Sequence, residues 1–458
     1  MQGREKKIPE QDRKEAIMIK VYLKNARIVD GTGAPAIENG LLVYVSAAEE
    51  SGEQQGIVYV GKMDEAVLAQ AGEKDRIIDL KNEYTLTPGL INTHVHLDLQ
   101  MPGAGFRLDP LGPAFRALKA YRRAAEALEC GVTTLRNVGG GDFFDVAIRK
   151  AVEIGMLNGP RIITCGWTLM AHGGHGSEDY GAIECTGPTE FTKEARKLLS
   201  KGVDWIKVGM TGGLEGAHEG LCDRQVTNEE IAAVIWPAHA AGKKVCAHLS
   251  DDATIYDAVT AGLDSVEHGY AMKENTCRLI AEKGKFYTPT LAVSSEDGVD
   301  YMLKHGFPKR NFEKSFTAKE GHRAAARFAH KHGVKVCVGT DMVPSDPVQR
   351  GCNATQLEME LLNEHAEFTP LETIKAATSV GAELCGVDHI TGSLKRGYEA
   401  DILAVRGKPD QDVKDMRNLQ MVIKSGGIIW STIPGHEARN YSVVGEGQIA
   451  EGGTYGNW

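Results

Sequence analysis

Six polar side chains fall where they could assemble a metal-binding site. His94 and His96 lie two residues apart at the end of an apolar run, so both face the same side of the expected strand. Four further positions of this kind lie within or at the end of later apolar runs: Lys207, His248, His268 and Asp341. One histidine at a strand end is more often an ordinary buried residue. Six positions in register predict one shared site at the carboxyl ends of the strands.

Lys207 carries the most specific signal, because it lies inside the apolar segment Trp205-Ile-Lys207-Val. An ammonium group there is costly unless it is paired or chemically altered. Two interpretations stay open. The lysine could extend its amine to water or pair with Asp341, or it could be carboxylated by CO2, so that its carbamate bridges two metal ions. The four histidines around it favour the carbamate.

The elements that must position these side chains alternate along the middle of the chain. About eight apolar, β-branched runs are separated by amphipathic segments that favour helices. Glycine follows many of the helical segments, which predicts left-handed helix caps. This alternation of strands and helices predicts an α/β fold with a (β/α)8 TIM barrel over residues 89–391. The expected strands are Leu90–Leu97, Val132–Val138, Arg161–Cys165, Asp204–Met210, Lys244–His248, Asp264–His268, Phe286–Leu291 and Val334–Asp341.

Short strands at both chain ends predict a second, smaller unit. Residues 18–88 and 392–440 alternate apolar and polar positions and are separated by turns, which is typical of half-buried strands. We expect them to pair with each other in a composite β-sandwich domain. Residues 1–17 are interpreted as a mobile leader, and residues 441–458 as a C-terminal tail.

Composition narrows the function classes. The chain has 458 residues, and 52 basic against 62 acidic side chains give a net charge of −10, which disfavours nucleic-acid binding. A hydrophobic content of 42% excludes a mainly disordered chain. Neither a signal peptide nor a membrane-length apolar stretch is visible. The nine cysteines are dispersed without a Cys-x-x-Cys motif. These features predict a cytoplasmic protein that does not bind membranes.

Together these motifs resemble the amidohydrolase superfamily. The resemblance lies in His94-Val-His96, Trp205-Ile-Lys207-Val, Val266-Glu-His268-Gly and Gly339-Thr-Asp341, and extends over nearly the whole chain beyond the leader. Gly173-Gly-His175-Gly resembles the prolidase-like branch, which contains metal-dependent dipeptidases, carboxypeptidases and imidazolonepropionase-like proteins.

The resemblance implies two divalent ions, with zinc the first choice. His94, His96 and Asp341 would hold the buried ion, and His248 and His268 the more exposed one. Carboxylated Lys207 and a hydroxide would bridge both. Asp341 would take the proton from the hydroxide and pass it to the leaving amine. Asp341, His268 and His175 are the candidate catalytic residues.

The resemblance also implies the substrate class. We expect hydrolysis of a C–N bond in N-acyl amino acids or dipeptides, with release of a C-terminal amino acid. A xenobiotic or mycotoxin amide fits the same site. The resemblance further implies a homo-oligomer.

Four residues outside the ligand set are candidate substrate contacts. His175 and His172 follow the third strand on the active-site side, with loop packing as the alternative for both. Tyr287 could line the pocket or pack in the core. Arg136 could bind a substrate carboxylate, although a buried ion pair is favoured. The loop 214–224 could gate the site, although a solvated loop is favoured.

Other charged positions are interpreted as structural or exposed. Glu267 is expected to point away from His268, because neighbouring strand residues face opposite sides. The basic stretch Lys304–Lys314 is interpreted as a solvated face. The remaining histidines are expected at the surface: His239, His305, His322, His330, His332, His365, His389 and His436.

Two alternatives remain open. A mononuclear deaminase or a cyclic-amide (imidazolone-type) hydrolase would not need Lys207. A deaminase would also need a glutamate three residues after His248, where this chain has Asp251. The second alternative is a non-catalytic oligomeric scaffold, which the retention of all six ligand positions disfavours.

Overall fold

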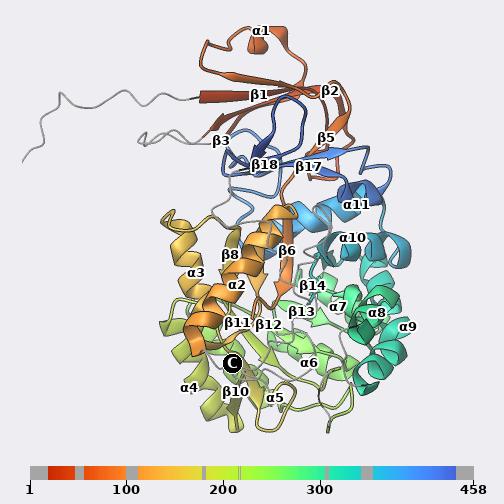
Figure 1. Cartoon of the computed structure of the whole chain (residues 1–458). Coiled ribbons are helices and arrows are strands. Elements are labelled where there is room, and N and C mark those ends of the chain that lie inside the picture. The colour runs from red at the N-terminus through yellow and green to blue at the C-terminus, as the bar shows by residue number, and fades with distance from the viewer. Residues whose placement is uncertain are drawn as a thin grey trace, which may run out of the picture.

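The computed structural model describes residues 19–46, 56–98, 112–177, 182–214, 216, 218–304, 309–341 and 354–439. The predicted leader and the tail 441–458 lie outside these residues. Across the described ranges, every helix is too short or too polar to cross a membrane. Figure 1 shows a sheet built from both chain ends above a larger body of alternating strands and helices.

The upper sheet joins the two chain ends through backbone pairing. Strand β5 runs antiparallel to β16, with Leu86 opposite Ala404. The strand order is β19-β18-β17-β16-β5-β1-β2-β3, and β4 pairs with β1. The strands are β1 (Ile19–Ile28), β2 (Ile37–Ser46), β3 (Gly56–Lys62), β4 (Arg76–Asp79), β5 (Tyr84–Pro88), β16 (Ile402–Arg406), β17 (Leu419–Lys424), β18 (Gly427–Ser431) and β19 (Ala438–Arg439). The short helix α1 (Glu65–Leu68) follows β3.

Parallel strands form the barrel. They are β6 (Leu90–Val95), β7 (Val132–Asn137), β8 (Arg161–Thr164), β11 (Trp205–Gly209), β12 (Lys244–Leu249), β13 (Ser265–His268), β14 (Phe286–Thr288) and β15 (Lys335–Val336). Backbone hydrogen bonds bridge the two seams between the paired runs. Thr93 N–H donates to the Val338 carbonyl (2.8 Å), and Asp204 N–H donates to the Thr164 carbonyl (2.9 Å). The predicted TIM-barrel fold class is confirmed.

Helices cover the outside of the barrel, and their apolar faces pack on the strands. They are α2 (Gly112–Glu129), α3 (Phe144–Glu153), α4 (Gly187–Ser200), α5 (Asn228–Ala240), α6 (Asp252–Ala261), α7 (Glu274–Glu282), α8 (Glu296–Lys304), α9 (Lys309–Lys331), α10 (Ala354–His365), α11 (Pro370–Lys375) and α12 (Gly381–Cys385). Gly262, which ends α6, has φ 114°, the left-handed cap that the sequence predicted there.

Three elements differ from the sequence prediction. Two extra strands, β9 (Thr168–Ala171) and β10 (Ala182–Cys185), follow β8, and β9 pairs with β11. Helix α9 begins at Lys309, within the basic stretch that the sequence predicts as a solvated face. Most residues before Gly321 are polar, and glycine disfavours a helix, so the sequence did not indicate this long helix. A Cβ at Gly321 would lie 2.8 Å from the Tyr270 carbonyl oxygen, so close packing explains this glycine within the helix.

Candidate active site

The six predicted ligand residues converge at the carboxyl ends of the barrel strands. His94 lies on β6, Lys207 on β11 and His248 on β12. His268 ends β13, and His96 directly follows β6. Asp341 lies five residues after the end of β15. Parallel strands bring these ends together, so positions from residue 94 to residue 341 become neighbours.

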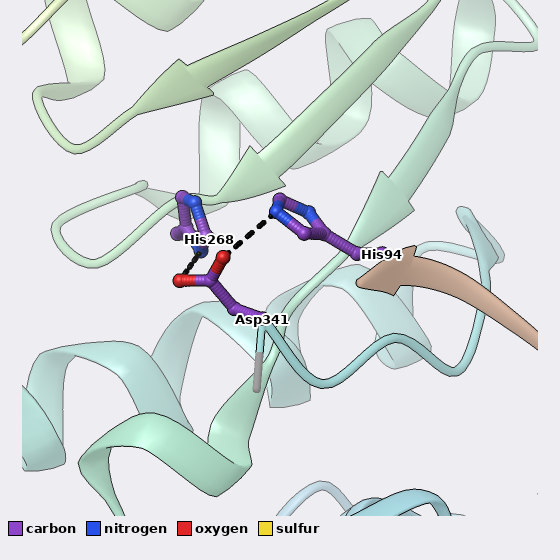
Figure 2. A group of neighbouring side chains, drawn as sticks. All are labelled: His94, His268 and Asp341. Carbon is purple, nitrogen blue, oxygen red and sulfur yellow. Dashed lines mark ion pairs between the residues drawn. The ribbon is translucent and has the colours of Figure 1, made fainter. Parts of the chain in front are cut away.

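His94, His268 and Asp341 form the tightest group. One ligand atom from each lies within 4.8 Å of the others, which is a spacing that could hold a metal ion. His94 Nε2 lies 3.0 Å from Asp341 Oδ1, and His268 Nδ1 lies 4.0 Å from Asp341 Oδ2. Figure 2 shows Asp341 between the two imidazoles. The Asp341 carboxylate therefore pairs with histidines from two different strands, His94 and His268.

Two of these residues have unusual backbone conformations. His268 has φ 69° and Asp341 has φ 54°, in the left-handed region that non-glycine residues seldom adopt. Tyr287 stabilises the first of them, because its hydroxyl donates to the His268 carbonyl at 2.7 Å. Backbone strain of this kind tends to gather at functional sites, where the surrounding structure enforces it.

His96 and Lys207 complete one side of the group. His96 Nε2 lies 3.3 Å from Asp341 Oδ1, and its Nδ1 lies 3.2 Å from the Gly139 carbonyl oxygen. Lys207 is almost fully buried, and its Nζ lies 3.4 Å from His94 Nε2. Among the described residues, Lys207 forms no ion pair with a carboxylate. Its amine therefore faces the imidazole of His94.

His248 lies on the other side. Its ring centroid is 4.5 Å from that of His268, and its ring stacks on His175 at 4.3 Å. His248 Nε2 lies 3.1 Å from the Gly212 carbonyl oxygen. The structure thus brings all six predicted ligand residues into one cluster, with His175 against its edge.

Burial sets the charge states of the cluster. Desolvation lowers the pKa of His94 and takes the pKa values of His248 and His268 well below their usual range, and the neighbouring Lys207 adds to each shift. Burial raises the pKa of Asp341, but His268 and His94 outweigh it and hold that pKa well below the ordinary value. Neutral imidazoles beside an ionised carboxylate are the protonation states that bind metals.

Glu267 differs from the sequence prediction, because it faces the cluster. It accepts hydrogen bonds from His94 Nδ1 (2.7 Å) and from Arg136 Nη2 (2.8 Å). The left-handed backbone at His268 breaks strand alternation, so neighbouring residues both reach the barrel interior. Burial raises the pKa of Glu267, but Arg136 and His94 lower it to about 2. Glu267 therefore orients His94 from behind, as carboxylates often do for metal-binding histidines.

Arg136 and Tyr287 lie in the core rather than on a substrate-facing surface. Arg136 is fully buried, donates through Nε to the Thr93 carbonyl (2.6 Å) and lies 4.7 Å above the Trp205 ring. Tyr287 is also fully buried. These positions favour the buried ion pair and the core-packing interpretations over substrate contact.

The two loop histidines have different surroundings. The His175 side chain is 15% exposed, and its Nδ1 lies 2.6 Å from Glu219 Oε1. The His172 side chain is 74% exposed, and its Nδ1 lies 3.4 Å from Glu184 Oε2. The structure therefore brings His175 to the edge of the cluster and leaves His172 at the surface.

His322 contradicts the sequence expectation of a surface histidine. It is fully buried, and its Nε2 donates to the Pro289 carbonyl at 2.6 Å. Its ring packs edge-on against Tyr270, which stacks in turn on His268. The α9 sequence is largely polar, so it did not indicate that the helix face with His322 is buried. Lys314, predicted as solvated, also makes specific contacts, with backbone carbonyls of the loop at residues 213–219.

Comparison with known proteins identifies the family. A model described as the amidohydrolase family matches residues 85–429, about three quarters of the chain. The chain belongs to the amidohydrolase family. Ochratoxinase of Aspergillus niger is 28% identical over 358 residues, 72% of each chain. Imidazolonepropionase of Geobacillus thermodenitrificans is 25% identical over 412 residues, 82% of this chain and 88% of that protein.

A solved structure extends the comparison to three dimensions. A Xaa-Pro dipeptidase with methionine bound in its active site matches with a TM-score of 0.78 and 26% identity, over 89% of this chain and 99% of that one. The predicted superfamily and prolidase-like branch are confirmed. The family places this protein among metal-dependent hydrolases of C–N bonds, as the sequence predicted.

Proposed function

We propose that this amidohydrolase is a binuclear metal enzyme that hydrolyses the amide bond of N-acyl amino acids or dipeptides and releases a C-terminal amino acid. The observation that carries the proposal is the convergence of four histidines, Lys207 and Asp341 at one end of the barrel. Zinc is the first choice, because imidazole and carboxylate ligands suit it, although manganese, cobalt and iron accept the same ligands.

The donor set fits two ions. His94, His96 and Asp341 have ligand atoms close enough to hold the buried ion. His248 and His268 lie side by side for the second. Lys207, once carboxylated, would supply an anionic ligand to both ions. Within the described residues the buried Lys207 amine has the His94 imidazole but no carboxylate as a close partner. Reaction of the neutral amine with CO2, with loss of one proton, would form a carbamate anion in place of a buried cation.

The chain's own residues supply the proton transfer. Bound divalent ions provide the Lewis acidity that activates water and polarises the substrate carbonyl. Asp341 is ionised near neutral pH, because His268 and His94 depress its pKa, so one of its oxygens can accept a proton. Asp341 then delivers that proton to the leaving amine nitrogen. His175, at the edge of the cluster, contacts the substrate or its developing oxyanion.

Two relatives support the substrate class. One is named ochratoxinase and the other a Xaa-Pro dipeptidase, so both an amide of a fungal toxin and a dipeptide are reasonable substrates. The imidazolonepropionase relative favours a second candidate, hydrolysis of a cyclic amide. A deaminase is disfavoured, because Asp251 caps helix α6 by accepting from the Thr254 N–H (2.9 Å) and hydroxyl (2.8 Å).

Amino-acid release from a substrate panel tests this proposal. The protein, loaded with zinc and bicarbonate, is incubated with N-acyl amino acids, Xaa-Pro dipeptides, a mycotoxin amide and an imidazolone. We expect turnover on at least one of the first three classes, and turnover lowered about 10³-fold in the matched Asp341→Asn protein. Turnover of the imidazolone alone would replace amide hydrolysis with cyclic-amide hydrolysis. No turnover by a fully metal-loaded protein would contradict the proposal.

A further inference from the structure

His175 is held against the metal-binding cluster by side chains that lie far from it in the sequence. Glu219 Oε1 lies 2.6 Å from His175 Nδ1, and Glu219 Oε2 accepts from Gln225 Nε2 at 2.6 Å. Gln225 also accepts the His175 backbone N–H through Oε1 at 2.9 Å. Glu219 and Gln225 thus hold both the ring and the backbone of one histidine.

Lys314 of helix α9 fixes the loop that carries Glu219. Its Nζ donates to the carbonyls of Gly213 (3.0 Å), Gly216 (2.7 Å) and Glu219 (2.9 Å). Lys314 therefore ties three described positions of this loop to helix α9.

Gly213 packs directly against the His175 ring. A Cβ at Gly213 would lie 2.2 Å from His175 Cε1 and 2.6 Å from its Nε2, distances that real Cβ atoms do not show. Gly213 N–H also donates to Glu219 Oε1 at 3.1 Å. The bare glycine therefore permits the imidazole to lie between this loop and the ring of His248.

We propose that Glu219 is a positioning residue that holds the His175 imidazole over His248, and that Gln225 and Lys314 keep Glu219 in place. The proposal rests on the proposed function, in which His175 contacts the substrate. Glu219 itself does not touch the reacting atoms. Its effect on turnover passes through His175, and this dependence separates it from a residue that only stabilises the loop.

A double-mutant cycle measures that dependence. Loss of a buried hydrogen-bond partner at a catalytic histidine lowers turnover by about tenfold to a hundredfold, so we expect this loss of kcat in Glu219→Ala. We expect His175→Ala to lose as much or more, and the Glu219→Ala/His175→Ala double variant to match His175→Ala alone. Metal content stays at the wild-type level in all three. Additive losses would overturn the proposal.

A hydrogen-bond swap supplies the rescue. In Glu219→Gln, the new amide N–H meets the Gln225 amide N–H, and in Gln225→Glu two carboxylates meet. The Glu219→Gln/Gln225→Glu protein restores one donor opposite each acceptor, including the acceptors for both His175 groups. We expect each single variant to lose about tenfold in kcat, and the swap to recover to within about threefold of wild type. A swap no better than the single variants would contradict the assigned bonds.

Hydrogen exchange provides a test that does not need turnover. We expect faster amide exchange at residues 173–177 in Glu219→Ala and in Gly213→Ala, and wild-type exchange in Glu313→Gln, which removes a carboxylate of an exposed α9 ion pair. Unchanged exchange in the first two variants would overturn the positioning role. If no amide is hydrolysed while exchange changes as expected, the proposed function fails but the His175 contacts stand.

Discussion

Two histidine–carboxylate pairs belong to the same cluster, where His248 and His268 lie between their histidines, and the two pairs are built in different ways. His94 and Glu267 come from strands β6 and β13, are fully buried, and meet at 2.7 Å. His175 and Glu219 come from two loops, are 15% and 10% exposed, and meet at 2.6 Å. The two distances are similar. The register of the barrel strands brings His94 and Glu267 together, whereas Gln225 of a loop and Lys314 of helix α9 hold Glu219 beside His175.

This difference separates two tasks. Arg136 also binds Glu267, so the strand pair is fixed from a second side within the buried core. Such rigidity suits a histidine that holds a metal ion. The loop pair is held by Gln225 and Lys314, so changes there are expected to alter the position of His175 without disturbing the barrel. We therefore expect variants of the strand pair to affect metal and stability, and variants of the loop pair to affect turnover.

The largest effect is expected at Asp341, which both His94 and His268 face. Asp341→Asn keeps the size of the side chain but removes the base, so we expect kcat to fall by about 10³-fold. Steady-state kinetics on the best substrate, with metal content measured in parallel, provides the test. A near-normal rate at full metal occupancy would remove Asp341 from the proton transfer.

Glu267→Gln is expected to break the strand pair. The change leaves the buried Arg136 guanidinium without its anionic partner, which costs about 3–5 kcal/mol of folding free energy. We expect a lower denaturant midpoint and reduced metal content. The matched Glu219→Gln variant should keep both near wild type. Equal destabilisation by the two variants would remove the distinction between the pairs.

The buried His322 makes the stability of the protein depend on pH. Burial lowers the pKa of His322 to about 4, whereas an unfolded histidine titrates near 6.5. The unfolded chain therefore binds the proton first, and the stabilising effect of neutral His322 is present above about pH 6.5 and lost as the pH falls towards 4. This pKa difference corresponds to about 3 kcal/mol of folding free energy.

Chemical denaturation between pH 7 and pH 4 tests this shift. We expect His322→Gln to be less stable at neutral pH, but to lose less additional stability on acidification than wild type does. The parent and the variant should be compared in the same metal-free state. Parallel pH curves for the two proteins would show that His322 does not titrate in this way.

The smallest effect is expected at Lys314. Lys314→Met removes the three bonds to the loop carbonyls but keeps the alkyl chain, so we expect a loss of less than about tenfold in kcat. Lys309→Met, which removes an exposed cation from the same helix, is the control and should behave as wild type. A loss equal to that of Glu219→Ala would make Lys314 as important as Glu219 itself.

The sequence predicted the parts of the site that follow from strand periodicity. His94, His248 and His268 end apolar runs, and parallel strands bring such ends together, so their convergence follows from the barrel. Glu267 was predicted to face away, because nothing in the sequence signals the positive φ of His268 that breaks the alternation.

The contacts of the loop at Glu219 could not be predicted from sequence periodicity. Glu219 and Lys314 are 95 positions apart, and no periodicity links a loop glutamate to a helix lysine. His322 was missed because the surrounding α9 sequence is polar, although one face of that helix is buried. Local patterns predict which strand ends meet, whereas side-chain bonds between distant loops and helices depend on tertiary packing.

Metal content measured by elemental mass spectrometry tests the central claim most directly. The protein is purified without chelators, supplied with bicarbonate, and compared with Lys207→Ala. The account predicts about two divalent ions per chain in wild type, and a loss of metal and activity together in the variant. One ion per chain, or full metal and full activity in Lys207→Ala, would contradict the carbamate-bridged binuclear site.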